Sequence, residues 1–246
     1  MIEAVIESRR KDLGGFEVGR VLPALQPQKT VGRRMVGPFI FLDHMGPARF
    51  QPGFPRSVDV RPHPHIGLST VTYLFSGEIT HRDSVGAVQD IIPGEVNWMT
   101  AGRGITHSER FERLRAEGGE MHGMQAWVAL PLEHEDDAPA FAHHGAEDLP
   151  TYESEDGLWA RLIAGEAFGA RAGVRTHSPM FYVHWRLEAG ARAQLAADYP
   201  ERAAFVAEGE VEVEGVRLRT GQLAVLQPRT RPLFTAVVPS HVMLLG

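Results

Sequence analysis

The sequence predicts an all-β protein made of two antiparallel β-barrels, jelly-roll-like in plan and packed together. Apolar and polar residues alternate over short stretches that end at glycines, which is typical of half-buried strands joined by tight turns. The chain also has 26 glycines and 17 prolines, enough to supply many such turns. In addition, its two halves follow a similar order of strands and turns, which favours two barrels of one design.

The clearest strand signal of the first half is LSTVTYLFSGEITHRD, residues 68–83, where β-branched or aromatic residues alternate with small polar ones. It breaks at Ser76-Gly77, and a second turn is expected at Pro93-Gly94. Long helical periodicity is not found. The segment HSERFERLRAEG, residues 107–118, predicts at most a short turn or an irregular loop.

The middle of the chain differs in composition from both halves. Residues 131–157 are acidic, rich in proline and poor in aliphatic side chains, which indicates an extended connection. We therefore expect an N-terminal metal-binding barrel over residues 1–135, an acidic connector over 136–157, and a C-terminal barrel over 158–246.

The second half contains a predicted hairpin, EVEVEGVRLR, residues 210–219, with a two-residue turn at Glu214-Gly215. The strand before it, in AFVAEGEV, ends at Gly209. In the first half, the strand in YLFSGEI ends at Gly77 in the same way. If the halves are aligned on these glycines, the positions of His63 and His65 correspond to Leu195 and Ala197. The C-terminal barrel is accordingly expected to be degenerate and to hold no metal.

Composition excludes several classes of function. A formal net charge of −6 argues against direct nucleic-acid binding, which depends on Lys and Arg at phosphates. No apolar run is long enough to cross a bilayer, and the N-terminus lacks the pattern of a signal peptide. The absence of cysteine removes disulfides and thiolate metal sites, and it favours a cytoplasmic protein.

Two short stretches predict a metal site. HPH places His63 and His65 at positions i and i+2 of a strand, and HSE places His107 and Glu109 in the same relation. Such residues point to one face of a strand, roughly 6.6 Å apart. Pro64 lacks an N–H, so its segment is expected at a strand start or a sheet edge.

Brought together, the two pairs offer three imidazoles and one carboxylate. This donor set suits Fe, Mn, Ni, Cu or Zn better than Ca or Mg. Four protein ligands on a six-coordinate divalent ion would leave two positions for water, O2 or substrate. Each pair alone has a simpler interpretation, as polar residues on an exposed strand.

Several segments of the first half resemble the pirin family of the cupin superfamily. They are VGPFIFLDHMGP (36–47), RPHPHIGLSTVTYLFSGEITHRDS (61–84), PGEVNWMTAGRGITHSE (93–109), HGMQAWVALP (122–131) and HHGAEDLP (143–150). The resemblance covers most of the first 150 residues, and the second half is similar to the degenerate second cupin of that family.

The resemblance implies a bicupin fold with one iron in the N-terminal barrel, ligated by His63, His65, His107 and Glu109. It also implies an activity, since some bacterial pirins and the human one open the flavonol quercetin with O2, as 2,3-dioxygenases. One departure stands out: many relatives carry a glutamate four residues after the second histidine, where this chain has Ser69. We expect this change to affect substrate turnover more than metal binding.

Other polar residues are expected to matter less. His44 is interpreted as a support for its turn or for the metal site, and His81 as a polar residue on the outer face of its strand. His122 and Gln125 are candidates for the barrel mouth. Phe41 and Trp98 are expected in the core or the cavity wall.

Two functions of different classes follow. The first is a metal-dependent, iron-using dioxygenase for flavonol-like aromatics and O2, in which Glu109 is both a ligand and the base that removes the substrate's 3-hydroxyl proton. The second is a non-enzymatic iron-binding pirin whose metal state regulates a protein partner, such as a transcription regulator or a metabolic enzyme. A third and simpler reading is a cupin that keeps its metal for stability alone.

Overall fold

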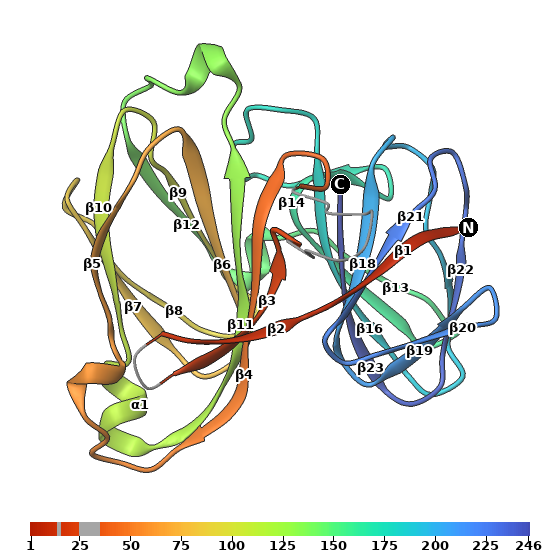
Figure 1. The fold of residues 1–246 in the computed structure, drawn as a ribbon, viewed down its shortest axis with the longest axis horizontal. Helices are drawn as coiled ribbons and strands as arrows, with labels where there is room; N and C mark the ends of the chain where they lie inside the picture. The colour runs from red at the N-terminus through yellow and green to blue at the C-terminus, as the bar shows by residue number, and fades with distance from the viewer. Residues whose placement is uncertain (14–15, 25–34) are drawn as a thin grey trace. The chain divides into compact units, whose positions relative to one another are not determined.

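The computed structural model describes residues 1–13, 16–24 and 35–246. It is built almost entirely of antiparallel strands, which confirms the predicted all-β class (Figure 1). The contacts divide the chain into two compact units. We call Arg9–Arg20 with Ile40–Glu147 the N-terminal unit, and Met1–Ser8 with Val21–Phe39 and Asp148–Gly246 the C-terminal unit.

The N-terminal unit has two sheets that face each other (Figure 1). The smaller has the order β5-β10-β7-β8, with bounds Val60–His65, Ile105–Arg110, Ile79–Asp83 and Val88–Ile91. The larger has the order β12-β9-β6-β11-β4-β3-β2, with bounds Ala140–His144, Val96–Thr100, Leu68–Ser76, Gly119–Ala129, Phe39–Phe50, Glu17–Leu22 and Arg9–Asp12. Single-turn 3-10 helices lie at Arg56–Val58, Leu132–His134 and Ala146–Asp148.

The C-terminal unit repeats this plan and has one additional short strand, β15. Its smaller sheet has the order β17-β22-β19-β20, with bounds Arg192–Gln194, Leu233–Ala236, Glu210–Val213 and Val216–Arg219. Its larger sheet has the order β1-β21-β18-β23-β16-β14-β13, with bounds Ile2–Glu7, Gln222–Leu226, Arg202–Glu208, Ser240–Leu245, Phe181–Leu187, Leu158–Ala167 and Thr151–Glu153; β15, Ala170–Arg171, pairs with β14. The matching strand orders agree with the internal similarity of the sequence.

Two edge strands, β1 and β12, differ from the predicted ranges. β1 begins the chain but pairs with β21 of the C-terminal unit, and β12, within the predicted connector, pairs with β9 of the N-terminal unit. Each strand covers the otherwise exposed edge of its neighbour, which stabilises a sheet wherever the covering segment stands in the sequence. The alternation of apolar and polar residues within a strand does not show which other strand it will pair with.

The predicted hairpin at Glu214-Gly215 is confirmed. β19 and β20 pair with Val213 opposite Val216, and both turn residues have positive φ, 50° and 81°, as a two-residue turn of this type requires. Val211, Val213 and Leu218 are buried, whereas Val216 beside the turn is 43% exposed.

The prediction that residues 107–118 form only a turn or loop was wrong. Residues up to Arg110 belong to β10, and Glu112–Glu117 form the short helix α1. Leu114 of α1 is buried in the same apolar cluster as Phe111, and this packing stabilises a helix too short to show periodicity. Gly118, with φ of 72°, ends the helix.

No helix in the described ranges has the length and apolar character needed to cross a bilayer.

An apolar core fills the C-terminal barrel where the metal ligands of the other barrel would lie. In topology β17 corresponds to β5, and Ala193 of β17 and Leu195, the residue directly after it, are buried in this core. Of the two positions that the alignment on glycines selected, Leu195 is therefore in the apolar core, whereas Ala197 is only partly buried.

Leu195→Ala is expected to lower the free energy of unfolding by roughly 2–5 kcal/mol, because a buried leucine is replaced by a cavity. Chemical denaturation measures this effect, and elemental analysis should show unchanged metal content. Leu132→Ala is the matched control, because Leu132 is 82% exposed. Unchanged stability of the Leu195 variant would contradict the packing described here, and altered metal content would contradict a metal site confined to the other barrel.

Candidate metal centre

Two paired strands position the predicted ligands. His63 and His65 lie on β5, and His107 and Glu109 lie on β10. The antiparallel register places His63 opposite His107. β5 forms the edge of its sheet, which agrees with the expectation drawn from Pro64.

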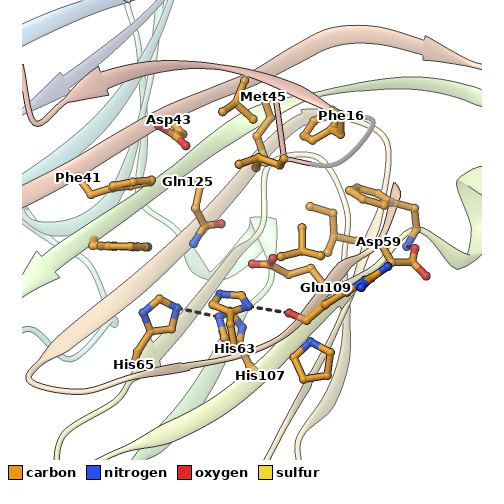
Figure 2. Close-up of a pocket in the computed structure, with 18 of the residues that line it drawn as sticks. Phe16, Phe41, Asp43, Met45, Asp59, His63, His65, His107, Glu109 and Gln125 are labelled. Carbon is orange, nitrogen blue, oxygen red and sulfur yellow. Dashed lines mark hydrogen bonds between the residues drawn. The ribbon is translucent and has the colours of Figure 1, made fainter. Parts of the chain in front are cut away.

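The pairing of these strands is irregular between His107 and Glu109. Glu109 lies opposite Val60 rather than Arg61, so two residues along β10 span three along β5. Bulges of this kind redirect side chains and are common beside active sites. Here nitrogens of the three histidines lie within 4.8 Å of one another. Glu109 lines the same cavity but stands outside that group (Figure 2).

The spacing of the histidines fits a shared metal ion. Nε2 of His65 and Nε2 of His107 are 3.1 Å apart. Two neighbouring nitrogens bound at ~2.0–2.1 Å to one ion in tetrahedral or octahedral geometry lie about 2.8–3.4 Å apart. The rings of His63 and His107 are also close, with centroids 4.5 Å apart. Three imidazoles with a nearby carboxylate form a donor set for a transition metal.

The backbone determines which nitrogen of His63 is free. Its Nδ1 donates to the carbonyl oxygen of Arg61 at 2.8 Å (Figure 2). A carbonyl only accepts hydrogen bonds, so the proton of the neutral ring is on Nδ1. Nε2 of His63 therefore keeps its lone pair for a metal.

Burial keeps the other two imidazoles neutral. Burial, together with the neighbouring imidazoles, lowers the pKa of His107 to about 2. Burial and the proximity of His63 lower the pKa of His65 to about 4. Burial raises the pKa of the Glu109 carboxyl, and His63 acts in the opposite direction. Neutral imidazoles are the form that binds metal. At neutral pH a metal would therefore displace few protons from these two rings.

The histidines open into a cavity of about 600 Å³, within the range of sites for small organic ligands. Half of its twenty lining residues are aromatic or aliphatic, and the other half are polar or charged. The lining residues are Leu13, Phe16, Val18, Arg20, Phe41, Asp43, Met45, Ser57, Asp59, Val60, Arg61, Pro62, His63, His65, Ile79, His107, Glu109, Phe111, Gln125 and Trp127.

One wall of the cavity is a series of stacked planar groups. The rings of Phe41 and Trp127 lie 4.0 Å apart and almost parallel, at 11°. Trp127 also meets His65 edge to face at 5.0 Å. At the other end the Arg20 guanidinium lies 4.5 Å from the Phe41 ring and bonds both oxygens of Asp43 at 2.9 Å. This wall connects the metal centre to a charged pair.

Of the two candidates for the barrel mouth, only Gln125 lines the cavity. Gln125 accepts a hydrogen bond from Thr72 at 2.8 Å. His122 is three residues away on the same strand, so it faces the opposite side of the sheet. There its Nε2 lies 2.8 Å from Nε2 of His44, and burial lowers the pKa of His44 to about 3. Neither histidine belongs to the cavity.

The expectation for His81 was wrong. Its side chain is only 6% exposed, and its Nδ1 lies 3.4 Å from Nδ1 of His107. The prediction failed because β7 has β10 as a direct neighbour, with His81 opposite Glu109. Burial lowers the pKa of His81, while its hydrogen bond to Asp83 opposes that shift.

Ser69 does not line the cavity. It lies on β6 and shares a hydrogen bond of 3.2 Å with Thr100. On the same strand Thr72 faces the cavity side, where it bonds Gln125, and Ser69 is three residues away on the other face. The serine therefore does not remove a carboxylate from this cavity.

Sequence reasoning missed Arg20 and Asp43, which complete the stacked wall, and Trp127 at its centre. Arg20 and Asp43 are 23 residues apart, and no local pattern links them. Trp127 could have been found, because it lies two residues after Gln125 and so shares its face of the strand.

Comparison with known protein families gives two matches. The family model described as pirin matches residues 16–128, and the model described as the pirin C-terminal cupin domain matches residues 182–246.

Individual relatives agree. A "Pirin-like protein" of Caulobacter vibrioides is 65% identical over 100% of this chain and 83% of its own. A Pseudomonas aeruginosa protein named "Putative quercetin 2,3-dioxygenase" is 43% identical over 95% of this chain and 70% of its own. The crystal structure of a quercetin 2,3-dioxygenase from Acinetobacter baumannii superposes with a TM-score of 0.87 at 33% identity, covering 98% of this chain and 77% of that one.

Proposed function

The chain belongs to the pirin family of the cupin superfamily, and from this premise we propose that it is an iron-dependent dioxygenase that opens flavonols such as quercetin with O2. The observation that carries the proposal is the cluster of three imidazoles at an aromatic cavity of flavonol size. The names of the Pseudomonas and Acinetobacter relatives support the same reaction, although the 65% identical relative is named only as pirin-like.

The metal would be held by His63, His65, His107 and Glu109. Three neutral nitrogens and one carboxylate suit iron, and Mn, Ni, Cu or Zn are alternatives for the same donor set. When bound, the ion would supply positive charge for a deprotonated substrate and a redox partner for O2. Glu109 stands outside the nitrogen cluster, so it would have to approach the ion by a change in its side chain.

The protein's own groups would orient the substrate and move its proton. The edges of the stacked Phe41 and Trp127 rings would contact a planar flavonol, with its 3-hydroxyl toward the histidines. The Glu109 carboxylate would accept the proton of that hydroxyl. Opening of the central ring would then consume one O2 and release carbon monoxide.

Iron-loaded protein is expected to consume O2 with quercetin and to release carbon monoxide in equal amount. An oxygen electrode and a haem-based carbon monoxide assay measure the two. The matched control is luteolin, which is quercetin without the 3-hydroxyl and should give no uptake. Removal of the metal with a chelator should stop the reaction, and iron should restore it.

Metal-loaded protein that consumes no O2 with any flavonol would contradict this proposal. That outcome would favour the alternative, a non-enzymatic pirin whose iron state regulates a protein partner. Protein that binds no metal at all would contradict both.

A further inference from the structure

His107 contacts another imidazole through each of its two ring nitrogens. Nε2 faces His65 at 3.1 Å, on the side of the candidate metal centre. Nδ1 faces Nδ1 of His81 at 3.4 Å. His81 lies on β7, which pairs with β10 (Figure 1). His81 is not among the residues that line the cavity. Its position is explained by its contact with His107, without a bound metal.

His81 is held in place by Asp83. Its Nε2 donates to Oδ2 of Asp83 at 2.9 Å, and its ring stacks on Phe141 with centroids 4.4 Å apart. The Asp83 side chain is 0% exposed. Its other oxygen, Oδ1, accepts hydrogen bonds from the backbone N–H groups of Val85 at 3.0 Å and Ala87 at 2.9 Å. Oδ2 of Asp83 therefore accepts from His81, and Oδ1 accepts from the two backbone N–H groups.

Proton positions along this chain follow from donor and acceptor chemistry. A carboxylate only accepts, so Nε2 of His81 carries the proton of its neutral ring and Nδ1 is an acceptor. The facing Nδ1 of His107 must then be the donor, since two unprotonated nitrogens would repel each other. One proton per neutral ring leaves Nε2 of His107 with a free lone pair directed at His65 and the metal centre.

We propose that Asp83 and His81 are positioning residues, which act through His107 by selecting the tautomer whose Nε2 can bind a metal. The inference rests on the proposed metal site, although the tautomer itself exists without metal. Partners outside the ligand set commonly orient metal-binding histidines in this way. Here the partner is a second histidine rather than a carboxylate in direct contact.

His63 provides an internal reference. Its tautomer is selected independently, by the carbonyl oxygen of Arg61 at 2.8 Å. Asp83 and His81 have no hydrogen bond to His63 among those of the described residues. A change at Asp83 should therefore alter His107 and leave His63 as it was.

Asp83→Asn tests the inference, because it should reverse the proton order. The two backbone N–H groups of Val85 and Ala87 require an oxygen at the Oδ1 position. The amide would consequently present its NH2 to His81, whose Nε2 must then accept, so that its Nδ1 donates. His107 is driven to carry its proton on Nε2. A reversal of the same kind inactivates the serine protease triad when its aspartate becomes asparagine.

Two measurements report the result. In metal-free protein with 15N-labelled histidine, NMR should show the His107 proton on Nδ1 in the wild type and on Nε2 in Asp83→Asn, with His63 unchanged. Zn2+ affinity, measured against a chromophoric chelator, should fall by ~10–100-fold in the variant. His81→Phe, which preserves the stacking on Phe141, should lose less, because it leaves His107 free to adopt either tautomer.

Asp90→Asn is the matched control. Asp90 is on the adjacent strand β8 and accepts a hydrogen bond from Thr80, so the substitution makes the same change in charge without contacting His81. Zn2+ affinity should stay at the wild-type value.

Three results would overturn the inference: a wild-type His107 protonated on Nε2, an Asp83→Asn protein with unchanged tautomer and affinity, or a larger loss in His81→Phe than in Asp83→Asn. The first needs no variant, so it decides the matter even if Asp83→Asn does not fold. A wild-type protein that binds no Zn2+ would count against the proposed function, while its NMR spectrum would still test the tautomer.

Discussion

His107→Ala is expected to abolish stoichiometric metal binding and to leave a folded protein. His107 is 3% exposed and lies between His65 and His81, with the His63 ring also in contact. Changes outside the ligand set typically reduce metal affinity ~10–100-fold, so loss of a ligand should exceed that range. Elemental analysis measures the metal, and circular dichroism verifies the fold.

The same loss is expected for His63→Ala and His65→Ala. His143→Ala is a suitable control, because His143 is a partly buried histidine of β12 whose hydrogen bond goes to Asn97. Full metal content in any of the three ligand variants would remove that histidine from the site. Loss of metal in the His143 variant would show that the assay reports general damage.

Glu109→Gln is expected to lower quercetin turnover by ~10²–10⁴-fold, the usual contribution of general acid–base catalysis. The amide keeps the size and an oxygen ligand but cannot accept the substrate's proton. Initial rates of O2 uptake, normalised to iron content, measure the effect. Part of the activity should return at high pH, where the 3-hydroxyl ionises without a base.

The pH dependence of the wild type has a defined direction. A base acts in its deprotonated form, and burial raises the pKa of Glu109 from the ordinary value of 4.5. Turnover should therefore rise with pH as Glu109 loses its proton, and Glu109→Gln should lack this rise at acidic pH.

Glu120→Gln, at a partly exposed glutamate outside the cavity, should behave as the wild type. Wild-type rates in an iron-loaded Glu109→Gln protein would rule out Glu109 as the base.

Features with a local cause could be predicted from the sequence. The period of two along a strand placed His63 with His65 and identified the hairpin at Glu214-Gly215. The same period would have paired Trp127 with Gln125. The imidazole and carboxylate donors then favoured a transition metal. The motifs, in their order along the chain, indicated the pirin family.

Features that depend on which strands become neighbours could not be predicted. The alternation that makes His81 a strand residue does not reveal that β7 pairs with β10, which brings its ring to His107. Similarly, Arg20 meets Asp43 only because β3 and β4 are adjacent in their sheet.

The sequence therefore predicted the all-β class and the family, which are confirmed, and it selected three histidines that the structure brings together, because side-chain alternation and ligand chemistry are local properties. The tertiary structure decided that β1 completes the C-terminal unit, that Ser69 faces away from the cavity, and that His81 lies between Asp83 and His107. Strand partners are selected by burial summed over a whole sheet, and that sum is not encoded in any short stretch of the chain.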